Sequence, residues 1–326
     1  MRREVPGMGS AEARPVVVVG DANPDLVVRG DVVPRFGQAE VLADSADLAV
    51  GGSAAIVAMG LARLGVPTSL ISRVGADVFG GLVSDGLRER GVDLRHLGVD
   101  PDVPTGLSVV LSRLEDRAIL TVPGTIPLLD PADVERALEA LPEPGHLHVA
   151  SFFLQPALAR GLPQILARAR EKGWTTSLDT NWDPSEQWEG VDAVLGGVDV
   201  LLPNRNELRA IGGALGGPSP RDDAGMAAWI AAFGPTVVVK DGAEGAWSVG
   251  PDGVTVCVAA FDVEVVDTTG AGDSFDAGYL AACAHGVLDE RTRLRWAVGA
   301  GSLSTRGTGG SDRQATQEEL LRLLAG

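Results

Sequence analysis

Short apolar runs that alternate with helical patterns are the feature that most limits how this chain can fold. Runs with the length of one strand recur at 15–20, 147–151, 175–179, 198–202 and 236–240. Uninterrupted apolar runs are typical of strands that are buried on both faces. Helical patterns lie between them, with start or stop signals at Gly65, Asp130-Pro131 and Thr316. The alternation predicts an α/β fold with a central, mainly parallel sheet and helices on both faces.

Two stretches interrupt this alternation, 27–50 and 105–121, because both read as extended chain without a helical period. Within the second, 105–111 and 117–121 are joined through Glu115 and Asp116, which predicts a hairpin. Such segments can pair into a small β-sheet that covers the ends of the main strands as a lid. We therefore expect a single domain over residues 1–326, with a lid formed mainly by about 27–50 and 105–121.

Charge and cysteine content exclude several classes of function. The chain has 27 Lys and Arg against 44 Asp and Glu, a formal net charge of −17, so it lacks the basic surface that binds nucleic acid or an anionic membrane. No segment is apolar over the length of a membrane span. Its two cysteines, Cys257 and Cys283, are too few for a disulfide framework or a zinc cluster, and we expect both to be buried. These features predict a cytoplasmic enzyme with no nucleic-acid or membrane partner.

The strongest chemical signal is the string DTTGAGDSF at 267–275, which follows the strand-like run Val263–Val266 and leads into a helical pattern. A Gly-Ala-Gly turn at a helix N-terminus presents backbone N–H groups that bind an anion such as phosphate. Asp273 would be unfavourable beside a phosphate unless it had a role. That role would be to take the proton from a hydroxyl that attacks phosphorus. The alternative is an aspartate that merely caps the helix.

The whole string, together with Gly278, resembles the C-terminal signature of the ribokinase-like (PfkB) carbohydrate kinases, DTTGAGDxFxxG. Four further segments resemble family elements in the same order, at 20–25, 51–56, 74–80 and 204–207. The resemblance covers roughly residues 15–312 and implies a ribokinase-like fold and an ATP-dependent kinase. Asp273 would be the general base, and the N–H groups of Gly270, Ala271 and Gly272 would stabilise the transferring phosphoryl group.

Asn204 and Glu207 follow the run 198–202 and so belong to the strand edge where ligands bind in open α/β sheets. Oxygen side chains suit Mg²⁺, held through water. The same spacing fits a helix N-cap and its N3 partner equally well, and both roles are compatible.

The resemblance also implies a nucleotide site and a monovalent-cation site. Lys240, Gly242 and Gly245 follow another strand and would lie along ATP, although alone they read as an ordinary glycine turn. Gly301 and Ser304 belong to a small-residue segment that resembles the family's adenine-side loop. Asp267 is the candidate ligand of a monovalent cation such as K⁺.

On the acceptor side the matching residues are Asn23, Asp25, Gly51 and Gly52, which would hold sugar hydroxyls. Two positions depart from the family. Ile56 stands where the family usually has Asn, which favours a less hydroxylated or bulkier acceptor. Asp183 stands where many relatives have Arg and would repel an acidic substrate if it faced the site.

The sequence therefore predicts an ATP-dependent phosphotransferase that acts on a hydroxyl of a sugar or sugar-like polyol. Two alternatives stay open: a nucleoside kinase of the same fold, favoured by Ile56, and a catalytically silent sugar-binding regulatory protein. An apolar outer face of the lid would favour a homodimer. His146 and His148 share a strand face without a third ligand, so we expect packing there and no metal.

Overall fold

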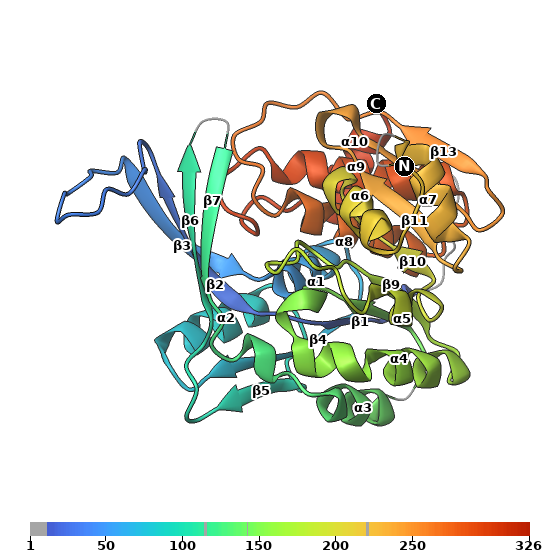
Figure 1. The fold of residues 1–326 in the computed structure, drawn as a ribbon, viewed down its shortest axis with the longest axis horizontal. Coiled ribbons are helices and arrows are strands. Elements are labelled where there is room, and N and C mark those ends of the chain that lie inside the picture. Colours follow the sequence, from blue (N-terminus) through green and yellow to red (C-terminus); the bar gives the residue numbers. More distant parts are fainter. Residues whose placement is uncertain (1–11, 114–115, 142, 220–221) are drawn as a thin grey trace.

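The computed structural model describes residues 12–113, 116–141, 143–219 and 222–326. Within these residues the main sheet has nine strands, in the order β13-β12-β11-β10-β9-β8-β1-β4-β5 (Figure 1). Seven neighbouring strands, from β11 to β5, are parallel, and at one edge β12 pairs antiparallel with both β11 and β13. The strands are β1 (Val16–Val19), β4 (Thr68–Gly75), β5 (Leu97–Asp100), β8 (His146–Val149), β9 (Thr175–Leu178), β10 (Val200–Leu201), β11 (Thr236–Lys240), β12 (Ala246–Val249) and β13 (Thr255–Val258).

Strand β1 shows why the apolar runs are uninterrupted. Val16 and Val18 pack into the core on one face of the sheet, and Val17 and Val19 pack into the core on the other. Successive side chains of a strand point to opposite faces, so a strand covered on both sides needs an apolar residue at every position. The predicted fold class is confirmed.

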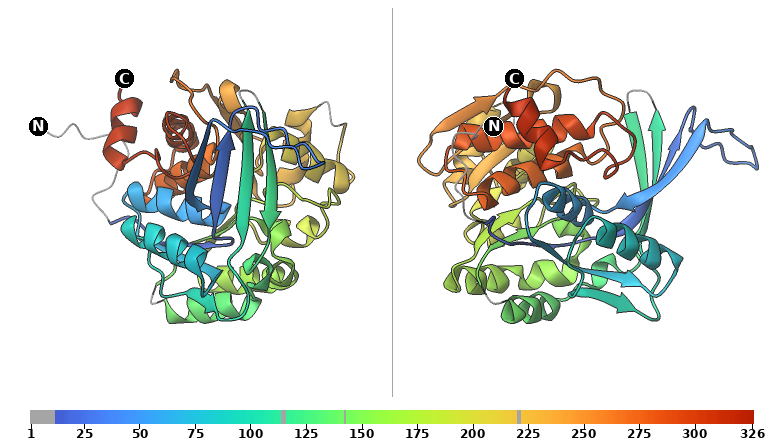
Figure 2. Two further views of the ribbon diagram at one scale, coloured as in Figure 1. Left: turned by 90° about the vertical axis from the view of Figure 1, so that its left-hand side faces the viewer. Right: turned by 180° about the vertical axis from the view of Figure 1, so that it is seen from behind.

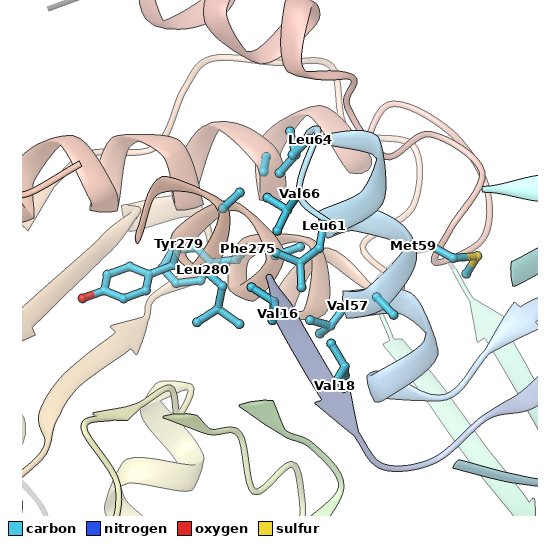
Figure 3. Close-up of a cluster of buried hydrophobic side chains, with 14 of the residues drawn as sticks. Val16, Val18, Val57, Met59, Leu61, Leu64, Val66, Phe275, Tyr279 and Leu280 are labelled. Carbon is cyan, nitrogen blue, oxygen red and sulfur yellow. The ribbon is translucent and has the colours of Figure 1, made fainter. Parts of the chain in front are cut away.

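Helices cover both faces of the main sheet. The first face carries α1 (Ser53–Arg63), α2 (Val78–Glu89), α8 (Ala271–Ala284), α9 (Glu290–Ser304) and α10 (Gln317–Leu324). The second carries α3 (Pro131–Ala140), α4 (Pro156–Glu171), α5 (Val191–Leu195), α6 (Arg205–Ala214) and α7 (Asp223–Ala231). Figure 3 shows how β1, α1 and α8 share the first core, which fixes the start of α8 against the start of α1. In the described ranges, no helix combines the length and the hydropathy that crossing a bilayer requires.

The lid is a second sheet with the strand order β3-β2-β6-β7. Its strands are β2 (Asn23–Arg29), β3 (Ser45–Gly51), β6 (Leu107–Arg113) and β7 (Asp116–Val122). They stand beside the main body, with one broad face turned outward (Figure 2, left). The predicted β6–β7 hairpin is confirmed, although Glu115 of its turn lies outside the described residues. The first lid strand begins earlier than expected, at Asn23, which places Asn23 and Asp25 on the lid itself.

The helix signals at Asp130 and Thr316 are confirmed, since both residues form capping boxes. Two local predictions were wrong. Val263–Val266 forms no strand, because the N–H groups of Val266 and Asp267 both bind the Thr305 carbonyl at the end of α9. Cys257 is exposed and not buried, because β13 is the edge strand of the sheet.

Candidate active site

The N-terminal turn of α8 lies between two cavities. Thr269 and Asp273 line a cavity of about 230 Å³, which we call the lid cavity. Ala271 and Gly272 line a second cavity of about 610 Å³, which we call the α8–α9 cavity. The Gly-Ala-Gly turn is therefore the boundary at which a ligand in one cavity meets a ligand in the other.

The lid cavity combines polar and apolar walls. The alternation along β6 and β7 points Ser108, Val110, Ile119 and Thr121 into it. Its polar lining includes Asp21, Asn23, Asp25, Ser53, Ser108, Arg117, Thr121, Ser151, Asn181, Thr269 and Asp273, and its apolar lining is Ile56, Val110, Ile119 and Leu154. Carboxylates and amides that converge on a small cavity suit a ligand rich in hydroxyl groups.

Asn23 and Asp25 are held in place at the start of β2. Asn23 Nδ2 donates to Asp25 Oδ1 at 3.0 Å and to Ser108 Oγ at 3.2 Å. Burial, together with the negative charges of Asp21 and Asp273, raises the pKa of Asp25 to about 7. Asp25 is thus a carboxyl group that gains by binding hydroxyl donors.

Of the two predicted substrate-site glycines, Gly52 lines the lid cavity, whereas Gly51 does not line it and instead makes room for Asp25. A Cβ atom on Gly51 would lie 2.1 Å from Asp25 Cγ, so only glycine leaves space for that side chain. Gly52 has a φ of 84° and lines the lid cavity directly before α1.

Asp273 belongs to the first turn of α8 and faces the lid cavity. Ser53 Oγ donates a hydrogen bond to Asp273 Oδ1, and Asn181 Nδ2 donates to Ser53 Oγ at 3.2 Å. Burial raises the pKa of Asp273 to about 7, against the opposing effect of the Ser53 hydrogen bond. A fixed carboxylate that titrates near neutrality is suited to general-base catalysis. Our sequence analysis missed Ser53 and Asn181, although Ser53 directly follows the Gly-Gly pair.

The backbone around Gly270 forms an anion site. Gly270 is the N-cap of α8 with a φ of 66°, a left-handed conformation that glycine adopts readily. Among the described residues no side chain caps this helix, and the N–H of Ala271 donates instead to the Thr268 carbonyl at 3.2 Å. Gly270 lines the lid cavity and Gly272 lines the α8–α9 cavity, so the turn stands where the two cavities meet. The N–H groups of Gly270 and Gly272 and the helix dipole favour a phosphate group at the boundary.

Four of the five residues predicted for the nucleotide line the α8–α9 cavity: Lys240, Gly242, Gly245 and Gly301. Ser304 does not, because it is buried in α9 and its hydroxyl donates to the Gly301 carbonyl at 2.8 Å. Ser302 faces the cavity instead. Its other walls include Phe261, Val263, Phe275 and Val298, which make an apolar slot.

A buried ionic triad that the sequence did not reveal lies beneath this turn. Lys240 Nζ binds Asp179 Oδ2 at 2.7 Å and Asp276 Oδ2 at 3.1 Å, and both carboxylates are almost fully buried. Burial raises the pKa of Asp276 well above its ordinary value. Burial acts in the same direction on Asp179, but Lys240 outweighs it and lowers the pKa of Asp179. The oxygens of Asp179, Asp273 and Asp276 lie within 4.8 Å of one another, and the ammonium group of Lys240 balances this charge.

Asn204 and Glu207 form the capping box of α6, the structural alternative that their spacing allowed. Asn204 Oδ1 accepts from the N–H of Asn206 and Glu207, and Glu207 Oε2 accepts from the Asn204 N–H at 2.8 Å. Burial and the charge of Asp179 raise the pKa of Glu207 to about 7. Neither residue lines either cavity, and Asn204 Oδ1 and Glu207 Oε2 both accept from backbone N–H groups of the cap.

Asp267 is engaged by nitrogen donors. Its Oδ1 accepts from the Thr269 N–H at 2.8 Å, and its Oδ2 accepts from the Gly309 N–H and from Arg29 Nη2, both at 3.1 Å. These N–H groups and Arg29 lower the pKa of Asp267 although burial opposes them.

The two departures from the family have different outcomes. Ile56 lines the lid cavity, as its place in the family pattern suggests. Asp183 does not face either cavity: it is buried and accepts from the N–H groups of Ser185, Gln187 and Trp188. Asp183 thus organises the loop after β9, and the expected repulsion of acidic substrates does not arise from it.

His146 and His148 pack inside the sheet. Both bind Ser177 Oγ at 2.7 Å, and burial lowers the pKa of both. Neither belongs to a cluster of metal-ligating side chains within the described residues.

Comparison with known proteins places this geometry in a family. The sequence profile of the pfkB family carbohydrate kinases matches residues 13–317. The fructokinase of Klebsiella pneumoniae is 31% identical over 94% of this chain and 98% of its own. Among solved structures, Arabidopsis thaliana ribokinase complexed with ribose and ATP is similar at a TM-score of 0.80, with 26% identity over 96% of this chain and 99% of that chain. A Vibrio cholerae O395 fructokinase double mutant bound to fructose, ADP and potassium is similar at a TM-score of 0.79, with 27% identity over 96% of this chain and 99% of that chain.

The match extends over nearly the whole chain, and the matched proteins are sugar kinases, namely a ribokinase and two fructokinases. It includes the turn that separates the two cavities and the carboxylate beside it. The chain therefore belongs to the pfkB family of carbohydrate kinases, the ribokinase-like phosphotransferases that have an alcohol group as acceptor.

Proposed function

We propose that this kinase transfers the γ-phosphoryl group of ATP to a hydroxyl of a sugar or sugar-like polyol in the lid cavity, with Asp273 as general base. The observation that carries the proposal is the position of the α8 turn. Its Asp273 side lines the lid cavity and its Gly272 side lines the α8–α9 cavity. Acceptor and donor would therefore meet at one set of N–H groups.

The acceptor would be oriented by the lid. Asp25 and Asn23 bind its hydroxyls, and a buried carboxylate that is left without partners penalises ligands that lack them. The attacking hydroxyl gives its proton to the Asp273 carboxylate while its oxygen bonds to phosphorus, and the bond between phosphorus and ADP breaks. Ser53 and Asn181 keep Asp273 in place during this step.

The α8–α9 cavity would hold the nucleotide. Its apolar walls suit a purine ring, and its glycines let the backbone approach the phosphates. The N–H groups of Gly270 and Gly272 then stabilise the charge on the transferring group, whereas the N–H of Ala271 donates to the Thr268 carbonyl. Asn204 and Glu207 offer the oxygen donors for Mg²⁺, held through water, and bound Mg²⁺ would neutralise phosphate charge.

One observation favours a nucleoside as the acceptor. Ile56, Val110, Ile119 and Leu154 make part of the lid cavity apolar, which suits a base or a less hydroxylated ring. A catalytically silent sugar-binding protein is the remaining alternative, and the intact set of Asp273, Ser53 and Asn181 argues against it.

A screen for ADP release separates these possibilities. The full chain is incubated with ATP, Mg²⁺ and single pentoses, hexoses, cyclitols or nucleosides. The matched variants are Asp273→Asn and Asp252→Asn, which changes an exposed turn. A compound that supports turnover by the wild type and by Asp252→Asn, but not by Asp273→Asn, supports the proposal and names the acceptor class. Ligand binding without turnover would overturn it in favour of the silent protein.

The outer face of the lid suits contact with a second copy of the chain. Leu48, Leu26, Val109 and Leu120 form one row across the four strands by their pairing register. Leu48 is 45% exposed and Leu120 is 61% exposed. An apolar row of this kind is typical of an interface, so the proposed assembly is a homodimer through the lid. The proposed compartment is the cytoplasm, where thiols such as the exposed Cys257 stay reduced.

A further inference from the structure

The contacts of Asp267 do not fit the cation site that its family position implies. Three N–H donors take three of the roughly four lone-pair positions of its carboxylate, and the nearby Thr305 carbonyl accepts from the N–H groups of both Val266 and Asp267. A metal cation requires oxygen lone pairs that are free of such donors. One of the three donors is a guanidinium group, which is itself a cation.

Arg29 brings this positive charge from the lid. It belongs to β2, 238 residues away from Asp267 in sequence, and its side chain is only 20% exposed. Its Nη1 binds Asp47 of the neighbouring strand β3, and its Nη2 binds Asp267. The planar fork of arginine is well suited to bridging two carboxylates, and its charge does not vary with pH.

The position of Arg29 links the two halves of the site. Residues 23, 25, 27 and 29 share one face of β2, because successive side chains alternate. Asn23 and Asp25 on this face line the lid cavity, and Asp267 stands two residues before Thr269, which also lines that cavity and leads into the anion turn. One strand thus holds the acceptor and fixes the loop that would bind the phosphoryl group.

We infer that Arg29 is a tethered cation that replaces a monovalent metal ion at Asp267, so that the anion turn of this kinase is held in place without K⁺. The potassium-bound relative in the comparison would then differ from this chain in how that loop is stabilised. The activity arm of the test below rests on the proposed function, whereas the stability arm does not.

The stability arm measures thermal unfolding of the full chain in KCl, NaCl and choline chloride at equal ionic strength, because salt screens exposed ion pairs. The variants are Arg29→Met, Arg29→Lys and the control Arg113→Met, which removes an exposed lid arginine that lies 3.8 Å from Asp31. For the wild type, Arg29→Lys and Arg113→Met, we expect the unfolding temperature of each protein to be the same in all three salts. Arg29→Met should unfold at a lower temperature, and K⁺ should recover part of the loss.

The activity arm measures turnover with ATP and an acceptor found by the screen. Wild-type turnover should be equal in KCl and choline chloride, and Arg29→Met should lose roughly tenfold without K⁺ and regain several-fold with it. Wild-type stability or turnover that rises with K⁺ but not with choline would overturn the inference. So would an Arg29→Met variant that behaves as the wild type does. If no acceptor supports turnover, the proposed function fails, and the stability arm still tests whether Arg29 replaces the metal ion. If Arg29→Met does not fold, the comparison of the wild type and Arg29→Lys in the three salts tests it.

Discussion

The hydroxyl of Ser53 donates a hydrogen bond to the Asp273 carboxylate and so joins the first turn of α1 to the first turn of α8. The two residues are 220 positions apart in sequence, and the shared core of α1 and α8 holds them together (Figure 3). The first turns of two helices therefore meet at one carboxylate. This is the position at which a proton acceptor next to a phosphate site is most useful.

Asp273→Asn should abolish most of the turnover. An amide cannot take the proton of the attacking hydroxyl, and removal of a general base costs roughly 10²–10⁴-fold in rate. The variant keeps the shape of the side chain, so acceptor binding measured by calorimetry should remain within a few-fold of the wild type. A variant that retains near wild-type turnover would contradict the role of Asp273.

The pH profile of kcat/KM should report the same group. Because the pKa of Asp273 is raised to about 7, the base is protonated and inactive below that pH, so kcat/KM should fall as the pH drops below 7. Ser53→Ala removes the hydrogen bond that lowers this pKa, so the acidic limb should move to higher pH. Thr121→Val, which alters the same cavity without touching Asp273, should change KM and leave the limb in place. A limb that does not move in Ser53→Ala would count against the assignment.

The fold could be predicted from the sequence because its signals are local. Burial of both sheet faces makes each central strand an apolar run, as at β1 and β11, and a capping box marks the start of α3 and of α10. Val263–Val266 misled the prediction because it is apolar in composition but exposed in part, with Val265 at 59%. Its partner is the end of α9, which no local pattern reveals.

The site could be predicted only where its residues form contiguous strings. Asp273, Asp25 and the Gly51-Gly52 pair lie in such strings, and the structure brings them to one cavity or to its wall. Ser53, Asn181 and Arg29 act through partners more than 100 residues away, so their roles depend on packing that the sequence alone does not encode locally. The same holds for the triad around Lys240, whose members come from β11, α8 and the end of β9.

That triad predicts unequal effects for its two carboxylates. Burial raises the pKa of Asp276 well above its ordinary value, so Asp276 is the carboxylate of the triad that holds a proton more tightly, and Asp276→Asn should cost less stability than loss of Lys240. The pKa of Asp179 is lowered, so Asp179 is the ionised partner of Lys240. Lys240→Met leaves this charge buried without a partner and should cost about 3–5 kcal/mol of unfolding free energy. Chemical denaturation of the three proteins at pH 7 measures the difference, and equal losses in Asp276→Asn and Lys240→Met would contradict it.

Asp25→Asn should weaken acceptor binding and raise the thermal stability of the protein. Burial and two neighbouring carboxylates raise the pKa of Asp25 to about 7, so the folded protein holds a proton there between about pH 4 and pH 7 that the unfolded chain releases. The contribution of Asp25 to stability is therefore present at low pH and lost as the pH rises through 7. Replacing it with a neutral amide should raise the melting temperature by roughly 2–6 °C at pH 8, and the gain should vanish near pH 4.

In the same Asp25→Asn variant, acceptor affinity should fall by roughly 10–100-fold, because hydrogen bonds to a charged group are lost. A gain in stability that is equal at both pH values would show that the charge of Asp25 is not its cause.

Leu120→Glu should separate the proposed homodimer. Leu120 ends the apolar row across the outer face of the lid, which is open to solvent in the single chain (Figure 2, left). In a dimer that buries this row, the substitution would place a carboxylate in an apolar contact, which costs several kcal/mol without a partner. Light scattering coupled to size-exclusion chromatography should therefore give a mass of two chains for the wild type and of one chain for the variant. Leu288→Glu is the matched control, since Leu288 is 86% exposed just before α9 and away from the lid, and it should stay dimeric. A wild type that remains monomeric at every concentration would rule out the interface, and a dimer that survives Leu120→Glu would move it off the lid.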